Sequence, residues 1–415
     1  MPMTSATSRV LPLAAPHAVT DEKSNAIESH QAIVVGAGSA GLAAAFALRK
    51  RGFETLVIER SDSVGARWRS RYDELRLNSW RPMSRLQGQG MPRRCGRYPS
   101  RDDVVAYLDG FATRNQIRVQ FNRTLTTVER DNGQWLLTTS TTPMRANYLV
   151  IATGWDAVPQ MPEWPGRGTF AAELIHSSDF RNAREYRDRS VLVVGAGNSG
   201  FDIASHLVKA GARVTLSMRS GPNLASREFF GIPGQPLLVY FLDHIPSKLA
   251  DFIVSIVQRL TFGDLSRYGI PLAPEGLYAN YRHHHRNPAV DDGFVAALKR
   301  GDGQVVAEVQ RLEGRDVVLV DGRRLQPDAV VCATGYRRGL APLVGHLGVL
   351  RGDGVPFSYS GAPEHPAAPR LYFCGMWGQF SGQIRLGPIH ARRIARAAAR
   401  DRRQRRGLSR QPAGS

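Results

Sequence analysis

Short apolar runs recur along this chain and are followed directly by small or glycine-rich residues. The runs lie at 32–35, 148–151, 191–194 and 329–332. Runs of this length between turn signals are typical of buried strands. An Ala- and Leu-rich helix is predicted after the first run, at 42–51, and another helix after the third, at about 201–210; each ends at a glycine. A further strand is predicted after each of these helices, at 54–58 and 213–218. The pattern predicts an α/β protein with two strand–helix–strand units.

Two glycine fingerprints open the two predicted helices. The first set is Gly36, Gly38 and Gly41; the second is Gly195, Gly197 and Gly200, with Asn198 and Ser199 before its last glycine. In this motif the first glycine makes the turn, the second lets the backbone approach a pyrophosphate, and the third lets helix and strand pack closely. The phosphates then lie at the positive end of the helix. Two such motifs predict two Rossmann-like domains whose dinucleotides meet, usually for electron transfer.

The residue that follows the second strand of each unit differs in charge. Glu59 stands where a carboxylate accepts both ribose hydroxyls of an adenosine and repels a 2′-phosphate, which favours FAD or NAD. Arg219, with Ser217 and Ser220 beside it, takes the corresponding place in the second unit. A guanidinium binds a 2′-phosphate in a bidentate way, so we expect NADPH there. The alternatives are a surface Glu and an ordinary surface Arg.

Composition limits the possible classes of protein. A chain of 415 residues is long enough for two domains, and no apolar run reaches the roughly 18 residues that a membrane span needs. Residues 1–28 are rich in Ser, Ala and Pro, which predicts a disordered tail and not a signal peptide. The three cysteines are scattered and form no Cys-x-x-Cys pair, which favours a cytoplasmic protein without a redox-active disulfide.

Arginine dominates the net charge of +19 and clusters in 67–101 and 392–406. Nucleic-acid binding is one interpretation of such a charge. We expect no nucleic-acid partner, because aromatic residues do not interleave with the arginines near the C-terminus and no nucleic-acid module is visible. A solvated helix end followed by a basic tail at 401–415 is the preferred interpretation. Basic residues near the cofactors would also help to hold NADPH.

Two strands lead into the same tripeptide, Ala-Thr-Gly, at 152–154 and 333–335. In flavoproteins that bind two nucleotides, such segments mark the places where the chain crosses between domains. The expected organisation is therefore a discontinuous FAD domain, at 29–158 and 326–400, with an NADPH domain inserted at 159–325.

A further segment resembles the fingerprint of the class B flavoprotein monooxygenases, Phe-x-Gly-x-x-x-His-x-x-x-aromatic. Phe170, His176 and Phe180 match it, and Ala172 stands where Gly is usual. The resemblance covers about 30–400 and is strongest for the flavin-containing and YUCCA-like monooxygenases. Other segments that carry it are 66–69 (Ala-Arg-Trp-Arg), 72–78 and 375–378 (Gly-Met-Trp-Gly).

The resemblance implies a reaction in two parts. NADPH reduces FAD, and the reduced flavin reacts with O2 to form a C4a-(hydro)peroxyflavin while NADP stays bound. One oxygen atom then passes to a small organic substrate, either at nitrogen or sulfur or by attack on a carbonyl, for example in an α-keto acid such as indole-3-pyruvate. Two alternatives stay open: an NADPH-dependent flavin reductase or oxidase without substrate oxygenation, and a non-catalytic FAD-binding protein.

The same resemblance assigns roles to individual residues. Asn78, followed by Ser79, aligns with the active-site Asn, whose neutral amide donates a hydrogen bond without supplying an acidic proton. Arg67 and Trp68 match flavin contacts. His176 is the fingerprint His; its alternative role is that of a hinge residue that orients the domain linker. The alternative for Asn78 is a turn residue.

Two features stay outside this assignment. The run His283-His284-His285 suggests a metal, but consecutive residues do not share a face and no carboxylate lies at ligand spacing in the sequence, so no metal is expected. The apolar stretch 237–262 is interrupted by charged residues. An amphipathic helix on a membrane surface is one interpretation of it. The preferred one is a pair of helices that line a substrate entrance. The oligomeric state is left open.

Overall fold

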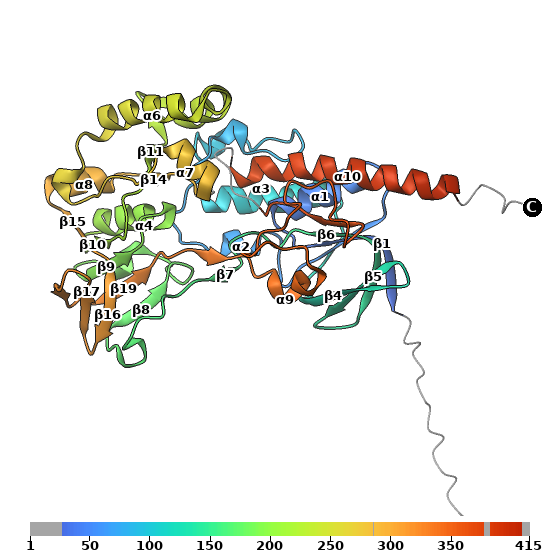
Figure 1. Cartoon of the computed structure of the whole chain (residues 1–415), viewed down its shortest axis with the longest axis horizontal. Coiled ribbons are helices and arrows are strands. Elements are labelled where there is room, and N and C mark those ends of the chain that lie inside the picture. Colours follow the sequence, from blue (N-terminus) through green and yellow to red (C-terminus); the bar gives the residue numbers. More distant parts are fainter. Residues whose placement is uncertain (1–26, 285, 377–381, 409–415) are drawn as a thin grey trace, which may run out of the picture.

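The computed structural model describes residues 27–284, 286–376 and 382–408, and within this part of the chain two sheets with parallel cores dominate (Figure 1). The expected α/β class is confirmed. The first sheet has the order β3-β2-β1-β6-β5-β4, with β21 also paired to β6. Its strands are β1 (Glu28–Val35), β2 (Thr55–Ile58), β3 (Val119–Gln120), β4 (Leu125–Asp131), β5 (Gln134–Thr139), β6 (Met144–Ile151) and β21 (Leu371–Phe373).

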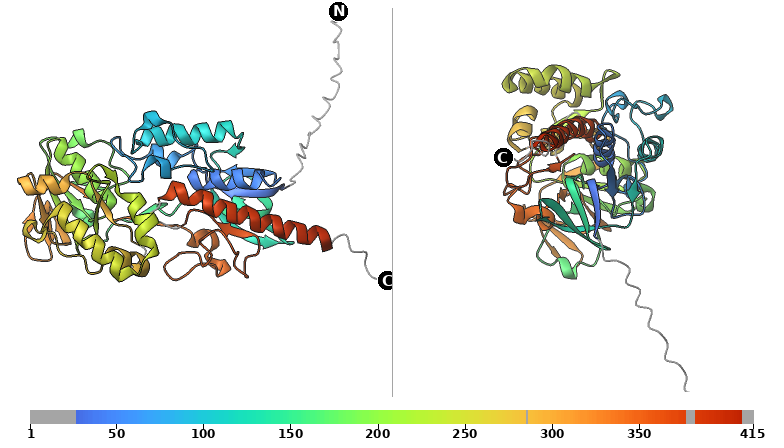
Figure 2. Two further views of the ribbon diagram at one scale, coloured as in Figure 1. Left: turned by 90° about the horizontal axis from the view of Figure 1, so that it is seen from above. Right: turned by 90° about the vertical axis from the view of Figure 1, so that its right-hand side faces the viewer.

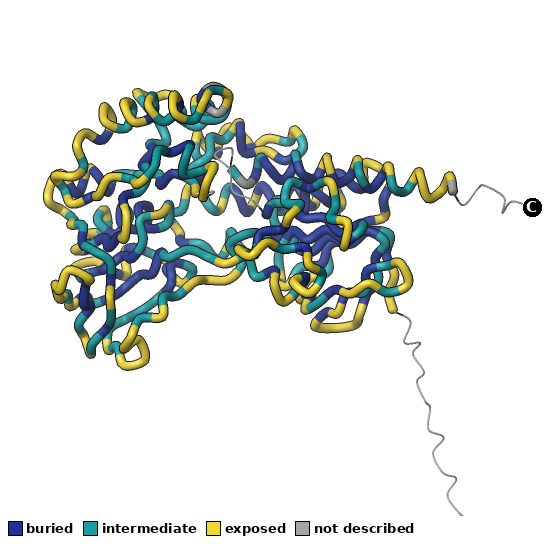
Figure 3. The backbone as a smooth tube through the Cα atoms, in the orientation of Figure 1, coloured by how far each residue is buried: buried dark blue, intermediate teal, exposed yellow. Residues whose placement is uncertain are grey.

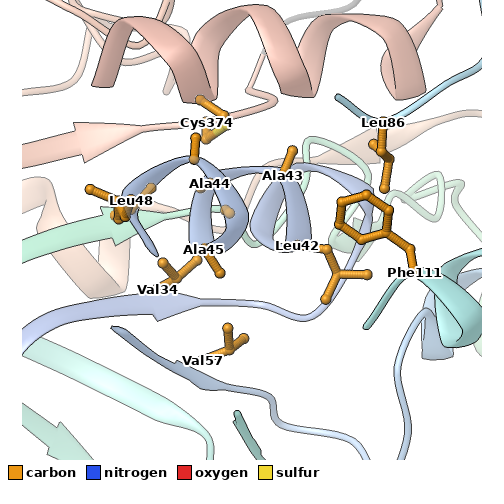
Figure 4. Packing of buried hydrophobic residues seen from close by; sticks show 14 of the residues in the cluster. Val34, Leu42, Ala43, Ala44, Ala45, Leu48, Val57, Leu86, Phe111 and Cys374 are labelled. Carbon is orange, nitrogen blue, oxygen red and sulfur yellow. The ribbon is translucent and has the colours of Figure 1, made fainter. Parts of the chain in front are cut away.

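Three helices cover one face of this sheet: α1 (Ser39–Arg49), α3 (Arg101–Arg114) and α10 (Gln383–Leu408). Helix α1 is mostly Ala and Leu, so α10 lies close along it in two views (Figure 2). Figure 4 shows α1 between the strands that carry Val34 and Val57 and the segment that carries Cys374. A Cβ on Gly375 would come within 2.5 Å of the Ala40 side chain. Small residues thus let the C-terminal part of the chain close over the first fingerprint helix.

Helix α10 runs through the boundary expected at 400/401, so the expected basic tail at 401–415 is wrong for 401–408. The hydroxyl of Tyr148 donates to Asp401 at 2.7 Å. The guanidinium of Arg402 lies over the Phe53 ring and donates to the carbonyl oxygens of Arg51 and Gly52. These contacts hold the last turns of α10 against the first sheet's domain. At least one arginine of the basic cluster, Arg402, therefore has a packing role. Residues 409–415, like 1–26, lie outside the described part.

The second sheet is parallel throughout, in the order β15-β10-β9-β19-β8. Helices α4 (Asn198–Lys209) and α8 (Phe294–Arg300) pack on one face, and a small antiparallel sheet covers the other. The strands are β8 (Glu173–His176), β9 (Ser190–Val194), β10 (Arg213–Ser217), β15 (Gly303–Val306) and β19 (Ala329–Cys332); the small sheet is β16 (Val309–Glu313), β17 (Asp316–Leu319) and β18 (Arg324–Leu325).

Strand β19 corrects the domain boundary expected at 325/326. It pairs with β9 and β8, so the second sheet extends through Cys332. The two chain crossings lie side by side: β7 (Val158–Pro159) follows the first Ala-Thr-Gly segment and pairs with β20 (Tyr336–Arg337), which follows the second. The crossing on the return is therefore β20, about ten residues later than the sequence suggested.

The remaining elements surround the two sheets. Exposed residues gather on α6 and at the far end of α10 (Figure 3). The other helices are α2 (Ala66–Arg69), α5 (Gly234–Pro236), α6 (Ser247–Phe262), α7 (Leu277–His284) and α9 (Ala341–Val344). Short helical turns are η1 (Arg81–Met83), η2 (Arg93–Cys95), η3 (Arg167–Thr169), η4 (Ala183–Tyr186), η5 (Leu237–Phe241), η6 (Leu242–His244), η7 (Ser266–Tyr268) and η8 (Gly345–Leu347). Strands β11 (Leu224–Ser226) and β14 (Ala289–Asp291) pair, as do β12 (Glu228–Phe229) and β13 (Ile232–Pro233).

Candidate dinucleotide site

Both fingerprints are packed in the same way at their outer glycines. A Cβ on Gly41 would lie 1.8 Å from the carbonyl oxygen of Gly36, and a Cβ on Gly200 would lie 1.8 Å from that of Gly195. The first glycines have positive φ, 106° at Gly36 and 113° at Gly195. A Cβ there would come within 2.6 Å of the Ala152 carbonyl or 2.5 Å of the Ala333 carbonyl, respectively. Each Ala-Thr-Gly segment therefore supports one fingerprint, and no side chain fits at these positions.

The middle glycines are in the opposite situation. Gly38 and Gly197 are the N-caps of α1 and α4, and a Cβ on either would meet no atom of the described residues within 4 Å. Neither helix has a side-chain cap at its N-terminus. The open space and the uncapped N–H groups fit a pyrophosphate at each helix N-terminus.

Glu59 follows β2 and is held toward the first fingerprint. Its carboxylate accepts the Ala37 N–H at 2.7 Å and the Ser61 N–H at 3.0 Å. The residue also lines the main cavity. A carboxylate fixed in this way has further acceptor capacity for a ligand, as the expected contact with two ribose hydroxyls requires.

Arg219 lies two positions after the end of β10 and is exposed. No described residue forms a hydrogen bond or an ion pair with its guanidinium. Its neighbour Ser217 is buried, and its hydroxyl donates to the Ala307 carbonyl at 2.8 Å, which turns it away from a ligand role. The two units thus differ as expected in the charge that follows the second strand, and a free guanidinium stands at the second one.

A cavity of about 890 Å³ connects the two units. It is lined by Gly36, Gly38, Glu59, Arg67, Trp68, Asn78 and Ser79 from the first part of the chain and by Asn198 and Ser199 from α4. Gly41, Gly195, Gly197, Gly200, Arg219 and His176 do not line it. Four buried polar atoms of its lining have no hydrogen-bond partner among the described residues: Arg67 Nε, Thr153 Oγ1, Asp202 Oδ1 and Asn287 Oδ1. Unpaired buried polar groups are costly, so this lining fits a large polar ligand.

Asn78 reaches across the cavity to the second unit. Its Nδ2 donates to Asn198 Oδ1 at 3.0 Å, and its Oδ1 accepts from Arg227 Nε at 3.2 Å. Ser79 beside it shares a hydrogen bond with Ser84 at 2.7 Å. The structure therefore brings Asn78 and Asn198 together, although 120 positions separate them in the chain. Sequence reasoning missed Arg227, because no motif surrounds it.

Arg67 lies in a cluster at the domain crossing. Its guanidinium donates to the Asp156 carbonyl at 2.7 Å and lies 4.9 Å from the centre of the Tyr336 ring. Burial, and then the neighbouring Arg71, lower the pKa of Arg67. Arg71 forms an ion pair with Asp156 and donates to the Tyr336 hydroxyl at 2.8 Å. Arg71 is a site residue that no sequence motif indicated. The two arginines join both crossings at the edge of the cavity.

His176 lies at the end of β8 and serves the linker between the units. Its Nδ1 accepts the Ser178 N–H at 3.0 Å, so the proton is on Nε2, which donates to the Gly335 carbonyl at 3.0 Å. The ring is 2% exposed and meets Tyr336 edge-on, and burial lowers its pKa. Both ring nitrogens are therefore occupied by other groups of the protein. This geometry favours the hinge role over proton transfer.

The other fingerprint positions are packing residues. Phe180 is fully buried and stacks on Tyr186, with ring centres 5.6 Å apart. Phe170 packs against the core on the far face of the second sheet. The resemblance at these positions thus reflects how the inserted unit is built.

The histidine run differs from the expectation in one respect. Glu275 contacts both His283 Nδ1, at 3.1 Å, and His284 Nε2, at 3.7 Å. Sequence spacing did not indicate this carboxylate, which comes near because the loop before α7 folds back onto the histidines. His285 lies outside the described residues. That no metal binds here stays a prediction.

The apolar stretch 237–262 also differs from a simple pair of helices. Among the side chains of this stretch that the structure describes, Leu238 alone lines the cavity, and Gln235 lines it just before the stretch begins. Helix α6 is further out and exposes Leu249, Phe252 and Leu260. Within the described residues of the stretch, η5 is therefore the element that the predicted entrance would involve. Among the described residues, no helix has the length and apolarity to cross a membrane.

Known proteins share this architecture. The sequence profile of the pyridine nucleotide-disulphide oxidoreductases matches residues 33–229. The probable indole-3-pyruvate monooxygenase YUCCA1 of Arabidopsis thaliana is 31% identical over 346 residues, 82% of this chain and 84% of the relative. The indole-3-pyruvate monooxygenase YUCCA8 of Oryza sativa subsp. indica is 35% identical over 317 residues, 74% of this chain and 75% of the relative. The flavin-containing monooxygenase of Stenotrophomonas maltophilia superposes with a TM-score of 0.68 at 20% identity, over 90% of this chain and 99% of that one.

Two fingerprinted sheets that share one cavity define a flavoprotein of the two-dinucleotide class. Within that class, the identity to the plant enzymes over most of both chains is decisive: the chain belongs to the flavin-dependent monooxygenase family that includes the YUCCA enzymes. It is accordingly an enzyme of this type and uses FAD and NADPH.

Proposed function

We propose that the enzyme uses NADPH and FAD to transfer one oxygen atom of O2 to a small organic substrate, and that this substrate is an α-keto acid such as indole-3-pyruvate. The observation that carries the proposal is the shared cavity, which the starts of both fingerprint helices reach. The plant relatives supply the substrate class, because their names contain indole-3-pyruvate.

Each part of the site has a role in this proposal. FAD, when bound, supplies the redox centre that accepts a hydride and activates oxygen. Glu59 holds the ribose of FAD, and the N-termini of α1 and α4 hold the two pyrophosphates. Arg219 binds the 2′-phosphate of NADPH. Asn78 has a second Nδ2 hydrogen, beyond the one given to Asn198, that is available to donate into the cavity.

Isotope labelling tests the proposal. The holoenzyme would be incubated with NADPH, indole-3-pyruvate and ¹⁸O₂. One oxygen atom enters the product and the other leaves as water, while the α-keto acid loses CO2 and NADPH is oxidised. We expect indole-3-acetate with one ¹⁸O, formed in a ratio near one to the NADPH consumed. Hydrogen peroxide in place of labelled product would identify an oxidase and overturn the proposal, as would a purified protein that takes up no flavin.

A further inference from the structure

A buried arginine from outside both fingerprints holds the amide of Asn78. Arg227 follows β11, and its side chain is 11% exposed. Its guanidinium has three acidic or amide partners: Asp292 at 2.8 Å, Asp202 at 3.5 Å and, through Nε, the Oδ1 of Asn78 at 3.2 Å. Two carboxylates thus fix the planar guanidinium and aim its Nε at one amide.

These carboxylates also explain why the arginine is fixed there. Asp202 is buried on α4 and accepts the hydroxyl of Tyr72, and burial raises its pKa. Asp202, His206 and Asp292 lie close enough together to resemble a metal-binding group. The guanidinium of Arg227 faces Asp202 and Asp292, the two carboxylates of this group, and supplies a positive charge beside them. Its position is therefore determined by the surroundings and not by Asn78.

The second partner of Asn78 is fixed by the backbone. Asn198 Nδ2 donates to the Pro288 carbonyl at 3.0 Å, and Asn198 Oδ1 accepts the Val290 N–H at 3.0 Å. A carbonyl only accepts and an N–H only donates, so the Asn198 amide has one orientation. Its Oδ1 is the atom that receives Asn78 Nδ2.

The orientation of the Asn78 amide is therefore set by a partner at each of its two polar atoms. A flipped amide would set its Nδ2 hydrogens against the Arg227 N–H and its Oδ1 against Asn198 Oδ1, which are two repulsive contacts. We infer that Arg227 is the positioning residue that fixes the Asn78 amide with its N–H side available to the cavity. The orientation follows from the contacts described; its consequence for oxygen transfer rests on the proposed function.

The substitution Arg227→Lys tests the inference with limited disturbance. Lysine keeps a positive charge for Asp202 and Asp292, but it has no Nε–H to donate to Asn78. Tyr72→Phe is the matched control, because it removes another buried contact to Asp202 and leaves both partners of Asn78 in place. If Arg227→Lys fails to fold, Asp292→Asn is used in its place. This variant removes one of the two carboxylates that hold the Arg227 guanidinium.

The first readout is independent of catalysis. In the FAD-loaded protein labelled with ¹⁵N-asparagine, the side-chain NH2 signals of Asn78 are assigned by their loss in Asn78→Asp. We expect one slowly exchanging proton in the wild type and in Tyr72→Phe. In Arg227→Lys we expect both protons to exchange at least about tenfold faster than the protected proton of the wild type, since the amide is free to rotate. Wild-type exchange in Arg227→Lys would overturn the inference.

The second readout is the ratio of product to NADPH consumed. We expect this ratio to fall on the order of tenfold in Arg227→Lys, because a misplaced donor is less costly than a lost one. The rate of flavin reduction by NADPH should stay near the wild-type value. Fast amide exchange with an unchanged ratio would uphold the positioning of Asn78 and reject its role in the proposed function.

Discussion

The two fingerprints have nearly the same backbone and differ in what surrounds it. Both outer glycines of each motif are closed by carbonyl oxygens, and both middle glycines face open space. After the second strand, however, the first unit has a carboxylate bonded to the glycine loop, whereas the second has an exposed guanidinium. The comparison teaches that packing closes two positions of the motif and leaves one open, so we predict that the open position serves the ligand and that a residue about 20 positions later selects the nucleotide.

The largest effect is expected at the third glycines. Gly41→Ala and Gly200→Ala each place a Cβ 1.8 Å from a backbone carbonyl, which cannot move without separating helix from strand. We expect each change to cost more than the roughly 1–3 kcal/mol of ordinary overpacking. Thermal melting measures the loss, and flavin absorbance separates the two variants. Gly41→Ala should lose FAD. Gly200→Ala should keep FAD and lose reduction by NADPH. Wild-type melting of either variant would contradict the packing described.

The middle glycines should affect ligands without affecting the fold. Gly38→Val fills the space next to the α1 N-terminus, so the purified protein should be colourless but fold normally. Gly197→Val should bind FAD and fail to be reduced by NADPH. Gly90→Val is the control, because Gly90 is also open to a Cβ and lies outside the cavity lining. Full flavin content in Gly38→Val would show that the pyrophosphate of FAD lies elsewhere.

Asn78 joins the two units, and its substitution should separate their activities. Asn78→Asp keeps an acceptor for Arg227 but loses the N–H groups and sets a negative charge against Asn198 Oδ1. FAD binding and flavin reduction should continue. Oxygenated product should fall on the order of a hundredfold, as when one preorganised donor is removed, with hydrogen peroxide accounting for most of the NADPH. An unchanged ratio of product to NADPH would reduce Asn78 to a turn residue.

Local patterns predicted the fingerprint elements well. The strands 32–35 and 191–194 lie in β1 and β9, and the helices that follow them are α1 and α4. The sequence also indicated Glu59 and Arg219, because their place is set by a fixed distance within one strand–helix–strand unit. Such information is local, so it can be read without knowing the fold.

Contacts between distant segments could not be read in this way. The sequence pattern of β19 would be the same in either sheet. Its pairing with β8 and β9 is what assigns it to the second sheet. The sequence pattern placed a tail after residue 400, whereas α10 continues to Leu408 and Arg402 packs on Phe53. Arg227 has no motif, since its importance comes from Asn78, Asp202 and Asp292, which lie far away in the chain.

The smallest effect is expected at Arg219, the position predicted to select the second nucleotide. Arg219→Ala removes one charge-assisted contact of roughly 1.5–3 kcal/mol, which should weaken NADPH binding about tenfold to a hundredfold. The Michaelis constant for NADH should stay nearly unchanged, because NADH has no 2′-phosphate.

Arg213→Ala provides a matched control for Arg219→Ala. It removes an exposed arginine from the start of the same strand, β10, where the guanidinium donates to the Asp188 carbonyl. The preference of Arg213→Ala for NADPH over NADH should match that of the wild type. The pair of variants thus separates the loss of one positive charge on the surface from the loss of a contact with the 2′-phosphate. If Arg219→Ala weakened both cofactors equally, the 2′-phosphate would be bound by another residue, and the contrast between Glu59 and Arg219 would not select the nucleotide.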